Sequence, residues 1–95
     1  MAAYFIANAR ITDPEGLDRY LAAVGPSLEG HDVKILAATN EATTIEGTPA
    51  GERAVILEFP DRAAALAWYN SDAYQEVVGL RLASTDGFAI VIDGR

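Results

Sequence analysis

The chain has 95 residues, of which 51% are hydrophobic, and this composition predicts a single globular domain over residues 1–95 with one core. Its formal net charge is −7 and its seven basic residues are scattered, which excludes nucleic acid as an expected partner because phosphate binding needs clustered Lys and Arg. No apolar run approaches the roughly 20 residues of a membrane span, no signal peptide is evident and cysteine is absent, so we expect a cytoplasmic protein without disulfides or a membrane partner.

Hydrophobic periodicity divides the chain into strand and helix segments. Near the start, Phe5 and Ala7 alternate with Ile6 and Asn8, which is typical of a strand with one apolar and one mixed face. Apolar residues at spacings of three and four indicate the helices. The expected elements in chain order are a strand over 4–11, a helix over 14–24, one turn over 27–30, strands over 33–38, 43–46 and 53–59, helices over 62–69 and 72–82, and a strand over 88–92.

Side-chain caps indicate where the helices begin. Thr12 or Asp13 can cap the first helix, and Glu15 stands where a capping box would place it. Asp61 can cap the second helix, and Ser71 can cap the continuation that follows an interruption. The apolar strand that ends before Asp61 is therefore expected to lead directly into a helix.

Apart from an elaboration of the middle hairpin, the order is β-α-β-β-α-β, which predicts the ferredoxin-like fold, an α+β sandwich with an antiparallel sheet. The helices of this fold cover only one face of the sheet. The strands over 53–59 and 88–92 are apolar at nearly every position, so the uncovered face is expected to be apolar as well. A second copy of the chain is the expected cover for such a face, and we therefore predict a homodimer.

One set of local patterns extends over nearly the whole chain. It consists of Tyr4-Phe-Ile, Thr12-Asp-Pro-Glu15, His31, Glu46-Gly47, Arg53, Glu58-Phe-Pro60, Ala67-Trp-Tyr69, Ser71-Asp-Ala-Tyr-Gln75, Arg81 and Val91-Ile-Asp-Gly94. Together these patterns resemble the family of the domain of unknown function 1330 (DUF1330). The resemblance implies a subunit of the dimeric α/β-barrel superfamily, in which two ferredoxin-like sheets join into one barrel that can hold a small molecule. Relatives there include cofactor-free monooxygenases, muconolactone isomerases and haem-binding chlorite dismutases, so the resemblance implies the fold more firmly than the chemistry.

Glu58 is the leading candidate for a catalytic residue. By alternation it shares a face with Ala54 and Ile56, away from the larger apolar set that suits contact with the helices, so we expect it toward the interior of the dimer barrel. A carboxylate in such a cavity suits a general base. The alternative is a structural salt bridge or a position at the rim, with Arg10 or Arg53 as its partner.

His31 is the second catalytic candidate, because histidine is the side chain best suited to proton transfer near neutral pH. The alternative is a surface or capping residue. Members of the family usually follow this histidine with glycines and a basic residue, whereas the chain has His31-Asp-Val-Lys34, which implies a differently shaped turn. A lone histidine without a second ligand nearby predicts no metal site, and nothing around it indicates haem binding, so no cofactor is expected.

Five further residues are predicted to contact a ligand. Tyr4, Asn8 and Arg10 form the mixed face of the first strand, where they could orient a carbonyl, a phenol or a carboxylate. The alternative for them is ordinary polarity at a sheet edge, with the one aromatic residue in the core of the dimer. Trp68 and Tyr69 end the second helix and could line the mouth of a pocket, or else pin that helix to the sheet.

The sequence leaves three classes of function open. The first is a cofactor-free isomerase or oxygenase that acts on a small hydrophobic organic molecule. The second is a non-catalytic module that binds such a molecule, and the third is a purely structural homodimer. A cavity reached by Glu58 favours the first two, whereas an interior filled by side chains favours the third.

Overall fold

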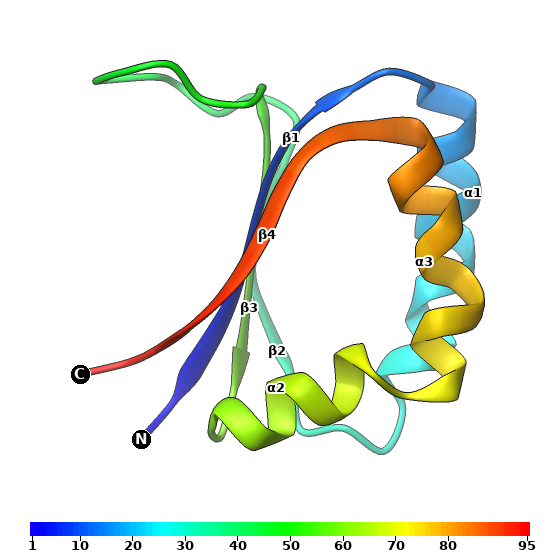
Figure 1. Cartoon of the computed structure of the whole chain (residues 1–95), viewed down its shortest axis with the longest axis vertical. Coiled ribbons are helices and arrows are strands. Elements are labelled where there is room, and N and C mark those ends of the chain that lie inside the picture. Colours follow the sequence, from blue (N-terminus) through cyan, green and yellow to red (C-terminus); the bar gives the residue numbers. More distant parts are fainter.

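Four antiparallel strands form one open sheet, and the helices all pack against one face of it (Figure 1). The computed structural model describes all of residues 1–95. The strand order β2-β3-β1-β4 is that of the predicted ferredoxin-like α+β fold, and a single chain does not close the sheet into a barrel. The elements are β1 (Ala3–Ile11), α1 (Pro14–Val24), the 3-10 turn η1 (Gly25–Leu28), β2 (Lys34–Thr39), β3 (Arg53–Phe59), α2 (Arg62–Tyr69), α3 (Asp72–Ser84) and β4 (Thr85–Asp93).

The three α-helices begin at side-chain caps, as the sequence predicts. Asp13 accepts a hydrogen bond from the N–H of Gly16 at 3.1 Å, Asp61 from that of Ala64 at 2.8 Å, and Ser71 from that of Tyr74 at 3.2 Å. The capping box expected at Glu15 is not formed, because Asp13 is the cap and the third helical residue is then Gly16. The N–H groups of Thr12 and Asp13 donate instead to the carbonyl of Ser84, at 2.8 and 3.1 Å. None of the helices is both long and apolar enough to cross a bilayer.

The core lies between the sheet and the helices and is centred on aromatic rings. Phe5 and Ala7 of β1 point toward the helices and are buried, whereas their neighbours along the strand are more exposed. The rings of Phe5 and Phe59 lie 5.4 and 5.6 Å from that of Trp68 on α2. Tyr74 on α3 lies 4.1 Å from the same ring. These contacts fix α2 and α3 against the middle of the sheet.

The opposite face of the sheet, here called the uncovered face, carries no helix and is largely apolar (Figure 1). Ile6 of β1 lies in register between Ile56 of β3 and Ile90 of β4, so isoleucines form a row across three strands. Phe88 and Ile92 flank Ile90 on β4, and these three residues are 48%, 41% and 47% exposed respectively. The apolar uncovered face predicted from the sequence is therefore present.

The connection between β2 and β3 differs from the prediction. Residues 43–46 were expected to form a strand because they are rich in β-branched side chains, but they lie in a loop that extends away from the helices (Figure 1). Only one backbone hydrogen bond joins the two arms of this loop, from the N–H of Ala42 to the carbonyl of Glu52 at 2.9 Å. Ile45 is 91% exposed. Composition favours a strand here, but no neighbouring strand provides a ladder.

The last strand is longer than expected because β1 continues to offer partners at its far end. β4 begins at Thr85, which pairs with Ile11, and it includes Gly87 rather than following it. A Cβ at Gly87 would collide with the carbonyl oxygen of Asn8. Glycine is therefore required here by close approach of two backbones.

The edge strand β2 contains an irregularity. Its pairing with β3 shifts by one residue between Ile35, which pairs with Leu57, and Ala37, which pairs with Ile56. Leu36 is the inserted residue and has no partner on β3. This two-to-one pairing is that of a β-bulge.

Candidate ligand-binding cavity

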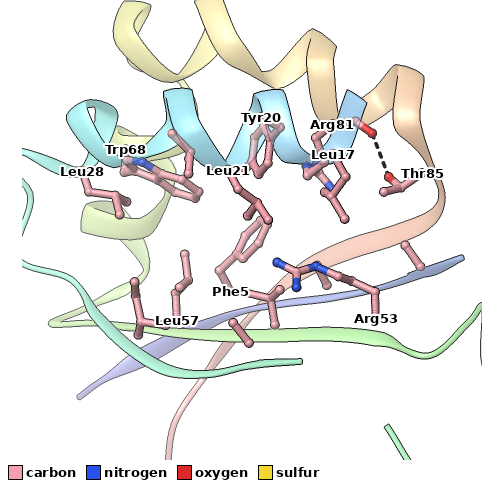
Figure 2. Close-up of a pocket in the computed structure, with 16 residues that line it drawn as sticks. Phe5, Leu17, Tyr20, Leu21, Leu28, Arg53, Leu57, Trp68, Arg81 and Thr85 are labelled. Carbon is pink, nitrogen blue, oxygen red and sulfur yellow. Dashed lines mark hydrogen bonds between the residues drawn. The ribbon is translucent and has the colours of Figure 1, made fainter. Parts of the chain in front are cut away.

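A cavity of about 120 Å³ lies between the sheet and the helices (Figure 2). Thirteen of its sixteen lining residues are hydrophobic, among them Phe5, Leu17 and Leu57. Leu21 and Ile35 also line it and are exposed, so the cavity opens to solvent beside β2. An apolar cavity of about 150 Å³ is large enough to bind benzene. The space is therefore of the size that holds part or all of one small ring.

The cavity exists because several side chains on the helix-facing side of the sheet are small. Ala7 and Ala9 of β1 and Ala38 of β2 line the cavity, facing Leu17 and Leu21 of α1. Larger apolar residues at these positions would extend into the space and fill it. The hollow thus results from alanines set among larger apolar residues.

The polar side chains of the lining are Arg53 of β3, Arg81 of α3 and Thr85 of β4. Arg53 donates from Nη1 to Oδ1 of Asn40 at 2.9 Å, and Thr85 donates from Oγ1 to the carbonyl of Arg81 at 2.8 Å. The Nε of Arg81 is buried and has no hydrogen-bond partner. Neither arginine forms an ion pair, since the three ion pairs of the chain join Arg10 to Asp86, Arg19 to Asp13 and Arg62 to Asp93.

Tyr20 of α1 completes the polar part of the cavity. Its hydroxyl oxygen lies 3.0 Å from that of Tyr74, and the two groups share a buried hydrogen bond. Burial, followed by the hydrogen bond and charge of Tyr74, raises the pKa of Tyr20 far above its usual value, although Arg81 and Arg53 act in the opposite direction. Tyr20 is therefore a neutral hydrogen-bonding group. Burial also lowers the pKa of Arg53, because the cation loses part of its hydration.

Of the residues predicted to bind a ligand, Trp68 lines this cavity and Tyr69 does not. Trp68 is 1% exposed, and its Nε1 donates to Oγ of Ser27 at 3.4 Å. Tyr69 packs against Phe5 and Tyr74 at ring distances of 6.4 and 5.3 Å. Both aromatic residues thus pin α2 to the sheet, and Trp68 also forms one wall of the hollow.

The predicted catalytic pair lies elsewhere. Glu58 points to the uncovered face, as its alternation with Leu57 indicates, and lies in register beside Lys34. With Lys34 and Asp32 it lines a polar depression of about 190 Å³. His31 is partly buried in the loop after η1, where its N–H donates to the carbonyl of Leu28 at 3.1 Å, and it lines neither the depression nor the cavity. The catalytic roles of both residues stay predictions.

The polar residues of β1 also point to the uncovered face. Asn8 donates from Nδ2 to the carbonyls of Gly51 and Arg53 at 3.0 and 2.9 Å, and its Oδ1 accepts from the N–H of Ala50 at 2.9 Å. This amide therefore anchors the base of the β2–β3 loop. Arg10 forms its exposed ion pair with Asp86, at 3.5 Å. Tyr4 is partly buried beside Glu58 in the β1–β3 register.

No three His, Cys, Asp or Glu side chains gather anywhere in the structure in the way that a metal site requires.

The family comparison bears out the resemblance of the sequence patterns. The family model described as "Domain of unknown function (DUF1330)" matches residues 2–95. The chain belongs to the DUF1330 family. None of the curated proteins compared with it matches at a significant level.

Solved structures similar to this DUF1330 protein share its fold at low sequence identity. A protein of unknown function from Rhodopseudomonas palustris has a TM-score of 0.78 at 20% identity, covering 99% of this chain and 82% of its own. SnoaB, a cofactor-independent oxygenase from Streptomyces nogalater, has a TM-score of 0.69 at 9% identity, covering 99% and 93%. A dimeric ferredoxin-like protein of unknown function from Thermobifida fusca has a TM-score of 0.66 at 14% identity, covering 99% and 92%.

The polar residues of the cavity were not predicted as a site from the sequence of this DUF1330 protein. Arg53 occupies a helix-facing position of β3, in alternation with Val55 and Leu57, and an arginine in an apolar set is a detectable signal. Arg81 likewise follows Tyr74 by seven residues, which places both on one side of α3. The ion pair between Arg53 and Glu58 that the sequence offers as an alternative is not formed, since alternation along β3 places the two side chains on opposite sides of the sheet.

Proposed function

We propose that this DUF1330 protein binds a small, largely apolar organic molecule in the cavity between its sheet and its helices. The observation that carries the proposal is a preformed hollow with thirteen hydrophobic lining residues, a few polar groups and an opening beside Leu21 and Ile35. Small-molecule sites in proteins have this composition. A protein with a purely structural role would gain stability by filling the hollow, because empty apolar volume costs free energy.

We further propose that the protein is a homodimer whose two sheets meet through their uncovered faces, as in a dimeric α/β barrel. The row formed by Ile6, Ile56 and Ile90, together with Phe88, supplies an apolar surface for a second copy. A similar structure from Thermobifida fusca is described as dimeric, which supports this arrangement. A stable dimer is expected to bury roughly 1,200–2,000 Å² in total.

Turnover of the bound molecule, as in a cofactor-free oxygenase or isomerase, is the second candidate. The likeness in fold to SnoaB favours it. However, the lining contains no Asp, Glu, His or Lys, and its titratable groups are Tyr20, Arg53 and Arg81. A general base within the cavity is therefore not supported, and a reaction there would depend on a substrate that loses its own proton readily. Binding is thus the better supported function.

Filling the cavity tests the binding proposal. Single-ring compounds such as benzoate and benzyl alcohol, added to isotope-labelled protein, should shift the methyl resonances of Leu17, Val55 and Leu57, which line the cavity. Ala7→Leu should abolish these shifts while the protein stays folded, because the new side chain occupies the hollow. Ala67→Leu, on the exposed side of α2, is the matched control and should bind like the wild type. Shifts that persist in Ala7→Leu would place the ligand elsewhere.

A further inference from the structure

The cavity has two chemically different ends. Figure 2 shows Arg53, Arg81 and Thr85 toward one end, with Trp68 and Leu57 toward the other. Arg53, Arg81 and Tyr20 line the same cavity, and Figure 2 shows the side chains of the two arginines in the same part of it. A ligand that fits this space is therefore expected to have a polar group at one end of an apolar body.

The two arginines of the polar end have no carboxylate partner, although the chain is rich in carboxylates. It contains fourteen acidic residues, and three of its exposed or half-exposed arginines are paired with them. Arg53 and Arg81, which line the cavity, are paired with none. Both side chains are partly buried, and a positive charge that is partly removed from water without a counter-charge is unfavourable.

Hydrogen-bonding capacity is also left unused at this end. Arg81 makes no side-chain hydrogen bond, and its Nε is fully buried, so water does not satisfy it. Arg53 uses one N–H on Asn40 and retains the others. Guanidinium groups present several donors in a planar fork that matches the two oxygens of a carboxylate.

We propose that the ligand of this cavity is a small carboxylate with an apolar body, whose anionic group is held between Arg53 and Arg81 while its body lies toward Trp68. The inference rests on the proposed binding function and names the class of the ligand. A carboxylate supplies the missing counter-charge, and its oxygens accept from the free donors. Thr85 has already donated its hydroxyl to the carbonyl of Arg81, so the site offers few donors beyond the two guanidinium groups. It therefore suits a monoanion better than a phosphate dianion.

Matched pairs of probes test the charge requirement. The pairs are benzoate with benzyl alcohol and cyclohexanecarboxylate with cyclohexanemethanol, each titrated into the full chain and followed by calorimetry. The carboxylate of each pair should bind about tenfold or more tightly than the alcohol, because a charge-assisted contact is lost in the alcohol. If the alcohols bind as tightly as the carboxylates, the cavity binds ligands but the anion site is refuted. If no probe binds, both proposals are overturned.

Arginine variants locate the anionic group. Arg53→Gln and Arg81→Gln should each lower the affinity for benzoate by roughly ten- to a hundredfold and leave the affinity for benzyl alcohol nearly unchanged. Arg62→Gln removes the same charge outside the cavity and should leave both affinities unchanged, which separates a local contact from net charge. Arg81→Lys keeps the charge but loses the fork, so it should retain only part of the preference, and it also serves if the Gln variants fail to fold. An equal loss of affinity for both probes in the arginine variants would show that these residues have a structural role only.

Discussion

The hydroxyl groups of Tyr20 on α1 and Tyr74 on α3 lie 3.0 Å apart and form a buried hydrogen bond between the two helices. Their rings are nearly perpendicular, at 82°, with centroids 6.4 Å apart. Tyr20 also lines the cavity, and Tyr74 packs on Trp68. One polar contact therefore links helix packing to the wall of the candidate site.

Removal of one hydroxyl from this pair should destabilise the fold. Tyr20→Phe leaves the Tyr74 hydroxyl buried without its partner, which should lower the free energy of unfolding by roughly 1–3 kcal/mol. The double variant, with Phe at both positions, should cost less than the sum of the single variants, because it leaves no orphaned hydroxyl. Urea denaturation of the four proteins measures this, and strict additivity would contradict the coupling.

Stability should fall in alkaline solution because of Tyr20. Burial and the contact with Tyr74 raise its pKa in the folded state, so the folded chain holds this proton more tightly than the unfolded chain. The contribution of protonated Tyr20 to the free energy of unfolding is fully present below the unfolded pKa of about 10 and is lost as the pH rises above that value. Unfolding measured from pH 8 to 11 should show a steeper decline for the wild type than for Tyr20→Phe. Parallel curves would rule out this origin.

Asp61 should contribute to stability as a helix cap. Its side chain accepts from the N–H of Ala64 at 2.8 Å, and Asp61→Ala should lower the free energy of unfolding by roughly 0.5–2 kcal/mol. Asp61→Asn keeps a capping oxygen and should restore most of the loss. The denaturant midpoint reports both effects, and an alanine variant as stable as the asparagine variant would show that the cap is unimportant.

A charge on the uncovered face should separate the proposed dimer. Ile90→Lys puts an ammonium group in the middle of the isoleucine row, and its burial in an interface is unfavourable. Sedimentation velocity should then show a species of half the wild-type mass. Leu82→Lys, at an exposed position on α3, is the matched control and should sediment like the wild type. Wild-type protein that is already monomeric at micromolar concentration would refute the dimer.

Most of the fold could be predicted from the sequence, because its signals are local. The caps Asp13, Asp61 and Ser71 and the period of two in β1 each depend on a few neighbouring residues. The prediction of a strand over 43–46 was wrong because strand formation depends on residues that are not local. A strand needs a partner, and composition alone does not show that the segment around Ile45 has none.

The candidate site was harder to predict, because the walls of the cavity come from segments that are far apart in the sequence. Alternation placed Glu58 on the uncovered face, but it does not show which side of the sheet contains unfilled volume. That volume lies between Ala7 of β1 and Leu17 of α1, which both line it, and their placement together is set by helix packing. The unpaired state of Arg53 and Arg81 is likewise visible only when every carboxylate has been placed in space.

The bulge at Leu36 has a consequence for self-association in fibrils. β2 is an edge strand whose hexapeptide Lys34–Thr39 is exposed along its whole length and contains a continuous apolar run from Ile35 to Ala38. Such a run on a regular edge would template further strands, as in cross-β aggregates. The inserted residue breaks the hydrogen-bonding register midway, so an incoming strand can match only one half of β2 at a time. We therefore expect this one extra residue to disfavour strand addition at the edge beside the cavity opening.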